Sequence, residues 1–116
     1  MPLRSETALA VEFWADRGVT GCPDGIATAI RPLTGVDGYG SSCRIEIAQR
    51  AVDHLRATRR LDRRRARYFA ERFCALVVHE VGHALGLGHS AHGVMRPDRH
   101  RAVPYECRSW ARRRGY

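Results

Sequence analysis

The chain has 116 residues and is 44% hydrophobic, which leaves room for one domain, residues 1–116, with a single core. No apolar run approaches the roughly 20 residues of a membrane-spanning helix, so we expect no membrane span. The net charge is +8, and all 20 basic residues are arginines. Because the complete absence of lysine indicates a compositional bias, we expect no specific nucleic-acid partner.

The first quarter of the chain predicts a helix and then a strand. Ser5 is a favourable N-cap residue for a helix that continues to about Arg17, where Gly18 follows as a stop. A turn over residues 20–25 leads into residues 26–30, which read as a short buried strand. The apolar stripe of the helix consists of Leu9, Ala10, Phe13 and Trp14.

The next segments predict a loop and a second strand. Residues 31–42 contain several glycines and serines and are predicted as a loop. Cys43, Ile45 and Ile47 alternate with charged residues, which is typical of a half-buried strand. Residues 49–61 fit either a helix or a further strand. The sequence therefore places only two strands.

A long helix and a short C-terminal helix complete the prediction. Asp62 can cap a helix that runs to about Leu85, and Pro104 can begin the last helix. The packed face of the long helix consists of Phe69, Ala70, Phe73, Leu76, Val77 and Ala84. One side of the last helix consists of Cys107, Trp110 and Ala111.

The four cysteines allow three complete pairings, and buried free thiols are the alternative. We favour Cys22–Cys43, which flank a candidate strand and its loop, and Cys74–Cys107, which would join the two last helices. Disulfides would stabilise a small domain with a thin core. We expect a secreted protein, although residues 1–7 lack the apolar segment of a signal peptide; a cytoplasmic protein is the alternative.

Residues 79–89 contain the strongest chemical signal. His79 and His83 lie one helical turn apart on one face, so both can reach a single metal ion. Glu80 is rotated by roughly 100° and lies beside that ion, where a base acting on water belongs. Gly86 can end the helix, so that the chain returns with His89 as third ligand. Three histidines leave one position of a Zn²⁺ ion open.

Three alternatives accompany this motif. One is a structural zinc site, which would favour four protein ligands, and another is a buried helix with scattered histidines. In the third, His92 replaces His89 as ligand. His54 and His100 have no partner at an informative spacing and are predicted to lie on the surface.

The motif His79-Glu80-x-x-His83-x-x-Gly86-x-x-His89, followed by Met95, resembles the metzincin clan of zinc peptidases. Ser90 directly after the third histidine makes it most similar to the matrixins, the matrix-metalloproteinase-like family. The tyrosine expected two residues after the methionine in astacins and serralysins is replaced by Pro97. The resemblance covers about residues 74–97.

The resemblance implies a small α+β zincin domain, with a short mixed sheet, a long zinc-binding helix and a C-terminal helix. It implies a zinc endopeptidase in which Glu80 is the general base and Met95 forms an apolar floor beneath the histidines. Met95 as an ordinary core residue is the alternative. Matrixin sheets also carry an antiparallel edge strand that pairs with the substrate, and no such strand is predicted here. We expect a monomer acting on proteins or peptides.

The resemblance also places the wall of a substrate pocket at Ala75, Leu76, Val94 and Pro97. None of these is charged, so apolar side chains are expected after the scissile bond, with Arg96 directed to solvent. Two rival functions remain: a non-catalytic zinc-binding protein, and a basic domain that binds polyanions through arginine clusters at 59–67 and 112–114. A structural zinc site would not require Glu80.

Overall fold

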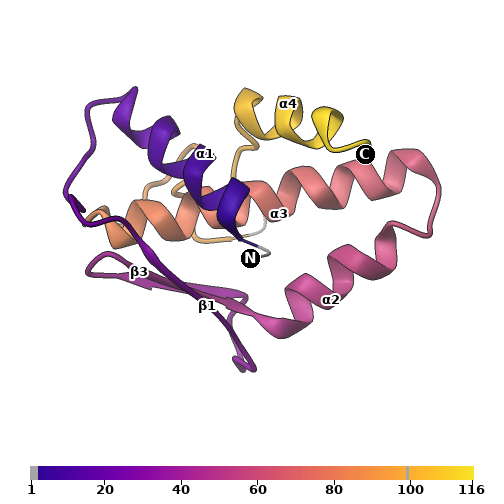
Figure 1. The fold of residues 1–116 in the computed structure, drawn as a ribbon, viewed down its shortest axis with the longest axis horizontal. Coiled ribbons are helices and arrows are strands. Elements are labelled where there is room, and N and C mark those ends of the chain that lie inside the picture. The colour runs from indigo at the N-terminus through magenta and orange to yellow at the C-terminus, as the bar shows by residue number, and fades with distance from the viewer. Residues whose placement is uncertain (1–2, 99) are drawn as a thin grey trace.

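The helix α3, Arg63–Ala84, is the longest element, and the other elements pack around it (Figure 1). The computed structural model describes residues 3–98 and 100–116 as four helices and one three-stranded sheet. Helices α1, Arg4–Ala15, and α4, Tyr105–Arg113, lie on one side of α3. The sheet and α2, Gln49–Thr58, lie on the opposite side. The predicted α+β class with a mixed sheet is confirmed.

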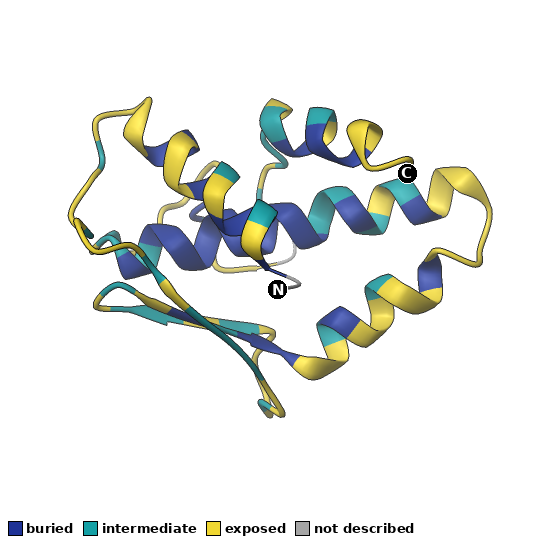
Figure 2. Ribbon diagram, in the orientation of Figure 1, coloured by how far each residue is buried: buried dark blue, intermediate teal, exposed yellow. Residues whose placement is uncertain are grey.

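The ends of α3 follow from individual residues. The carboxylate of Asp62 accepts a hydrogen bond from the Arg65 backbone N–H at 2.9 Å, as expected of an N-cap. Gly86 has a φ of +99°, a conformation that costs glycine little, and the helix ends just before it. Between these ends, the middle of α3 is almost continuously buried (Figure 2). The predicted cap and stop are both confirmed.

The sheet contains a strand that the sequence did not reveal. Its order is β1, Ala27–Arg31; β3, Arg44–Ala48; and β2, Gly38–Ser41, with β3 parallel to β1 and antiparallel to β2. The prediction of a continuous loop over residues 31–42 is therefore wrong for β2. The predicted buried strand at 26–30 is an edge strand; its middle residues are partly buried, and Ala27 and Arg31 at its ends are exposed. By contrast, Ile45 and Ile47 of the central strand are completely buried, as predicted.

The helices differ from the prediction in detail. Helix α1 begins at Arg4, with Leu3 in the N-cap position, so Ser5 is not the cap. The Ser5 hydroxyl instead donates a hydrogen bond to the Glu6 carboxylate at 2.7 Å. Residues 49–58, which fitted two structures, form α2. The apolar faces of α1 and α4 pack against α3 as expected, with Leu9 partly buried and Ala10, Phe13, Trp14, Cys107, Trp110 and Ala111 fully buried.

Both predicted disulfides are present. Cys22 is bonded to Cys43, and Cys74 is bonded to Cys107. The second bond joins α3 to α4 in the centre of the core, where both cysteines are fully buried. None of the helices in the described residues is long and apolar enough to cross a membrane.

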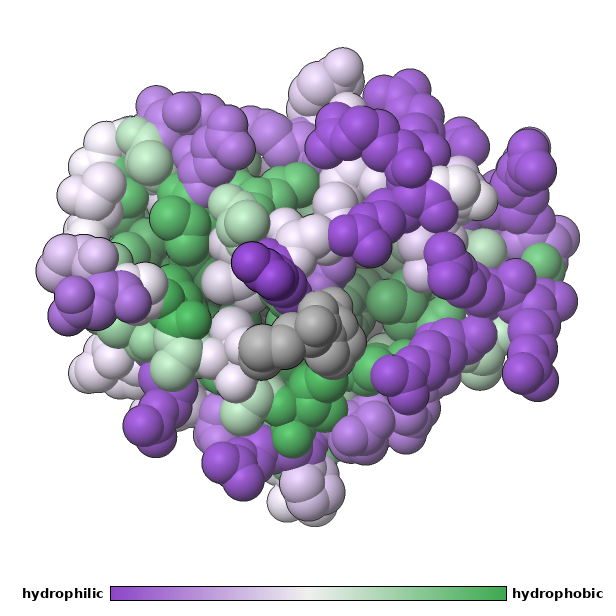
Figure 3. Space-filling model, in the orientation of Figure 1, coloured by the Kyte–Doolittle hydropathy of each residue, from purple (hydrophilic) through white to green (hydrophobic). Residues whose placement is uncertain are grey.

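The two arginine clusters meet at one end of the molecule. Arg59 donates a hydrogen bond to the carbonyl of Arg114, and Arg67 donates one to the main-chain oxygen of Tyr116. Hydrophilic side chains accordingly gather at this end, where α3 begins and α4 ends (Figure 3). These two clusters thus lie at the end of α3 opposite to the histidine motif.

Replacing both Cys74 and Cys107 by alanine is expected to lower the free energy of unfolding by about 2–4 kcal/mol. The bond closes a loop of 33 residues and so restricts the unfolded chain. Urea denaturation followed by circular dichroism measures the change. The matched control is the double alanine variant of Cys22 and Cys43, which closes a shorter loop of 21 residues at a partly exposed position and should cost less. An unchanged urea midpoint in the first variant would contradict this prediction.

Candidate metal centre

The fold brings together the three histidines that the motif singled out. His79 and His83 lie one turn apart on α3, and the chain turns back after Gly86 to bring His89 beside them. One ligand atom from each residue lies within 4.8 Å of the other two, so the group could hold a metal ion. The exposed His92 is not part of this group, which supports His89 as the third member.

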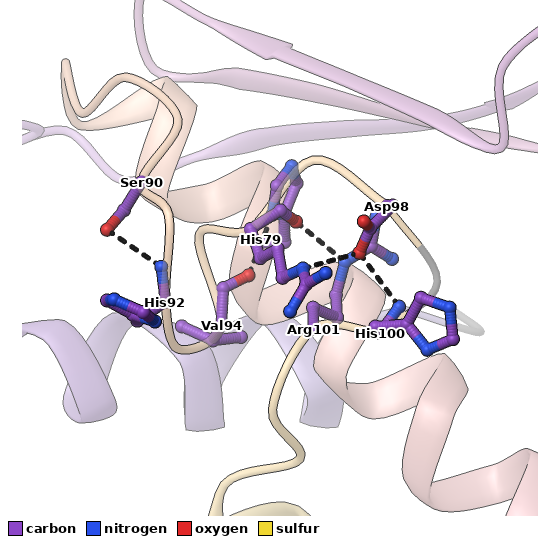
Figure 4. A network of polar contacts seen from close by, with 8 residues as sticks. His79, Ser90, His92, Val94, Asp98, His100 and Arg101 are labelled. Carbon is purple, nitrogen blue, oxygen red and sulfur yellow. Dashed lines mark hydrogen bonds and ion pairs between the residues drawn. The ribbon is translucent and has the colours of Figure 1, made fainter.

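Backbone carbonyls fix how two of these imidazoles present their nitrogens. The Nδ1 atom of His79 lies 2.8 Å from the carbonyl oxygen of Val94 (Figure 4), and that of His83 lies 2.7 Å from the carbonyl of Leu87. Because a carbonyl only accepts hydrogen bonds, Nδ1 is the donor in both rings. The Nε2 atom of each neutral ring then carries a lone pair. Metal-binding histidines are commonly oriented by such contacts.

The two Nε2 atoms converge. They lie 3.2 Å apart, with the ring centroids at 4.7 Å. Two lone pairs at this distance repel each other unless a cation lies between them. Burial, assisted by the charge of Arg101, lowers the pKa of His79 to about 4, so this imidazole is neutral at physiological pH. His79 is therefore already in the neutral form that binds a metal ion.

Glu80 lies beside this group in a nearly closed environment. Its side chain is only 5% exposed, and it lines the same cavity as the three histidines. Burial raises its pKa to about 7, although the positive charge of Arg101 acts in the opposite direction. A carboxyl group of this pKa is well matched to proton transfer near neutral pH.

The strand β2 packs directly over the turn of α3 that carries His79 and His83, because it contains two glycines. A Cβ atom at Gly40 would lie 2.0 Å from the carbonyl oxygen of Glu80, and one at Gly38 would lie 2.9 Å from the Glu80 side chain. Only residues without a side chain permit this approach. In the described chain, β2 has a neighbouring strand on one side only, and Gly38, Tyr39 and Gly40 line the cavity.

Replacing Gly40 by alanine is expected to destabilise the fold by about 1–3 kcal/mol, because backbone must move to admit the methyl group. Thermal or urea unfolding measures the effect. Gly88→Ala is the matched control: a Cβ there meets no atom within 4 Å, so its effect should stay within about 0.5 kcal/mol. Equal stability of the two variants would show that β2 does not lie this close to α3.

Met95 also packs against the helix that carries the histidines. It is buried, and a Cβ at Gly82 would lie 2.6 Å from its sulfur atom, so the glycine makes room for it. Trp14 contacts the same glycine, and its indole N–H donates a hydrogen bond to the Val78 carbonyl at 2.9 Å. Met95 therefore supports the turn of α3 between His79 and His83.

A cavity of about 920 Å³ extends from the three histidines along α3 toward α2. Of the four predicted wall residues, Leu76 and Pro97 line it, whereas Ala75 and Val94 are buried and do not. Arg96 lies outside the wall and pairs with Asp98 at 2.9 Å. The exposed His54 also lines the cavity, while His100 is exposed elsewhere.

The cavity wall also carries positive charges that the motif did not indicate. Arg72 on α3 and Arg101 on the segment before α4 both line it. Helical spacing could have placed Arg72 on the cavity wall, because it lies one turn before Leu76 on the same face of α3. Arg101 lies on an irregular loop, so no periodicity could have placed it.

Comparisons with known proteins gave no match. No protein-family model matches the chain, nor does any curated protein or solved structure. The resemblance to the metzincins therefore rests on the residues of the motif, and the function of the site must be inferred from its own geometry.

Proposed function

We propose that this chain is a zinc-dependent endopeptidase of the metzincin type, closest to the matrixins. The observation that carries the proposal is the combination of a three-histidine group with a buried carboxyl group from the adjacent residue, Glu80, both on the wall of a large cavity. A structural metal site has no need of such a carboxyl group. The presence of Glu80 therefore favours an enzyme over a non-catalytic zinc-binding protein.

Zinc is the metal that fits this donor set best. Two nitrogens bound to a tetrahedral zinc ion at about 2.0–2.1 Å lie roughly 3.3 Å apart, close to the 3.2 Å between the Nε2 atoms of His79 and His83. No fourth protein ligand joins the group among the described residues, which is typical of catalytic zinc. When bound, the zinc ion supplies a Lewis acid that polarises a carbonyl and makes water acidic.

The residues of the chain supply the proton transfers. The Glu80 carboxylate accepts a proton from the water whose oxygen attacks the carbonyl carbon of the peptide bond. It then gives that proton to the amine as the C–N bond breaks, so Glu80 ends the cycle in its starting form.

Substrate binding is assigned to β2 and the cavity. The unpaired edge of β2 can form backbone hydrogen bonds with an extended peptide, as a further strand would. We propose β2 as the counterpart of the antiparallel edge strand that pairs with the substrate in matrixins. Two disulfides are typical of an oxidising compartment. We therefore favour a secreted monomer that acts on proteins or peptides.

A digestion experiment tests the proposal. Protein loaded with one equivalent of zinc is incubated with a library of peptides, and new termini are identified by mass spectrometry. Cleavage within peptide chains that disappears after metal removal is the expected result. Absence of any zinc-dependent cleavage, with the metal bound and the fold intact, would favour a non-catalytic zinc-binding protein.

A further inference from the structure

Two guanidinium groups share the cavity with Glu80 and the histidines. Arg72 extends from α3 and Arg101 from the segment before α4, and both are half-buried. Phe69, Phe73 and Leu76 line the same cavity, so apolar wall adjoins the two cations. The cavity therefore combines a positively charged region with apolar surface.

Neither arginine forms an ion pair with a carboxylate among the described residues. The charges of Glu80, Asp37 and Asp98 act on Arg101 from a greater distance. The four ion pairs of the described residues, all within 4.0 Å, involve Arg17, Arg31, Arg50 and Arg96. The three residues outside the description, Met1, Pro2 and Arg99, are not acidic. The Arg101 side chain donates a long hydrogen bond of 3.5 Å to the Arg96 carbonyl oxygen. Most of the donors on both guanidinium groups are thus available to a ligand.

Arg50 provides a useful contrast within the same cavity. Its guanidinium donates hydrogen bonds to the carbonyls of Leu33 and Val36 and pairs with Asp37 at 3.0 Å. Arg50 therefore has partners within the protein and stabilises the loop before β2. Partly buried charges are usually paired in this way because desolvation is costly. Burial lowers the pKa of Arg101, the negative charge of Glu80 raises it, and the positive charge of Arg72 lowers it.

We propose that Arg72 and Arg101 form a subsite for a substrate carboxylate next to the scissile bond; this rests on the proposed peptidase function. A guanidinium matches a carboxylate in shape and charge, and two of them can hold it through several hydrogen bonds. The apolar wall suits the methylene groups of a glutamate side chain. This replaces the expectation of a purely apolar pocket. The C-terminal carboxylate of a peptide offers the same chemistry.

The main competing role of Arg101 is electrostatic. Its charge favours the ionised form of Glu80, so Arg101 could act on every substrate equally through this base. The two roles differ in selectivity. A carboxylate subsite affects acidic substrates and leaves neutral ones unchanged, whereas an effect on Glu80 lowers all rates together.

Paired peptides distinguish the roles. The zinc-loaded protein is given peptides that differ only in Glu or Gln at the positions flanking the cleavage site, each with a free or an amidated C-terminus. The proposal predicts a kcat/KM about tenfold or more higher for the Glu peptides. If the Glu peptide is still preferred over the Gln peptide when both C-termini are amidated, the subsite binds the glutamate side chain. If peptides with a free C-terminus are preferred over amidated ones, whether they contain Glu or Gln, the subsite binds the C-terminal carboxylate.

Substitutions complete the test. Arg101→Gln and Arg72→Gln should each reduce the ratio of kcat/KM for the Glu peptide to kcat/KM for the Gln peptide toward one. Arg96→Gln is the matched control, since Arg96 lies on the same segment but outside the cavity. With the wild type, equal kcat/KM for the Glu and Gln peptides, together with equal kcat/KM for free and amidated C-termini, would overturn the subsite. An equal loss on both peptides in Arg101→Gln would overturn it as well.

A binding measurement separates this inference from the peptidase proposal. N-acetylglutamate amide is added to the metal-free protein, and the arginine side-chain NMR signals are recorded. The subsite predicts shifts of the Arg72 and Arg101 signals that are absent with N-acetylglutamine amide. No shift overturns the subsite, even if peptides are cleaved. Shifts without any cleavage support the subsite and refute only the peptidase function.

Discussion

Glu80→Gln is expected to lower kcat/KM for peptide hydrolysis by about 10²–10⁴-fold, the usual contribution of a general base. Glutamine has nearly the same shape as glutamate, so the close contact with Gly38 of β2 is kept. The three histidines are unchanged, so the bound zinc should remain at one equivalent. The result would be an inactive protein with its metal and fold intact.

The measurement compares kcat/KM, zinc content and melting temperature in the same preparations of wild type and variant. Glu12→Gln is a suitable control, because Glu12 is an exposed carboxylate on α1 and does not line the cavity. It should retain full activity. Equal activity of Glu80→Gln and wild type would show that Glu80 is not the base.

His83→Ala is expected to abolish stoichiometric zinc binding and, with it, hydrolysis. The substitution removes one of three converging nitrogens and leaves an unpaired carbonyl at Leu87. The loss of affinity should exceed the 10–100-fold that is typical when only an outer partner of a ligand is lost. Equilibrium dialysis against a zinc buffer, followed by metal analysis, measures it.

His92→Ala is the matched control for this loss. It removes an exposed imidazole from the same loop as His89, outside the three-histidine group. Its zinc content should equal that of the wild type. If His92→Ala lost the metal while His83→Ala or His89→Ala retained it, the ligand set would be wrong.

Much of the site could be predicted because its residues are close in sequence. Helical periodicity alone places His79 and His83 on one face, and Gly86 both ends α3 and redirects the chain toward His89. The N-cap at Asp62 is an equally local signal. These features need no tertiary information, which explains why the structure agrees with them.

The strand β2 could not be predicted because it violates the usual strand signals. Glycine is depleted in strands, yet Gly38 and Gly40 are required by the contact with α3. The hairpin to β3 has Ser42 and Cys43 at positive φ, where Asn and Gly are the customary residues. Tertiary packing therefore overrides local preference, and that packing positions β2 beside the site.

The charged wall of the cavity was missed for a different reason. The resemblance to the metzincins implied a pocket wall close to Met95, but Arg101 lines the cavity from an irregular segment six residues later. Similarly, Ala75 and Val94 are close to the histidines in sequence but are buried and do not line the cavity. The direction of a side chain on a loop depends on long-range packing that spacing does not encode.

Titration of the metal-free protein with zinc tests the central claim most directly. Peptide hydrolysis is measured after each addition, using a peptide identified in the library digestion. The account predicts that the rate rises in proportion to added zinc and reaches a plateau at one equivalent per chain, with no rise in Glu80→Gln. Undiminished hydrolysis by the metal-free protein, or none with one equivalent of zinc bound, would contradict it.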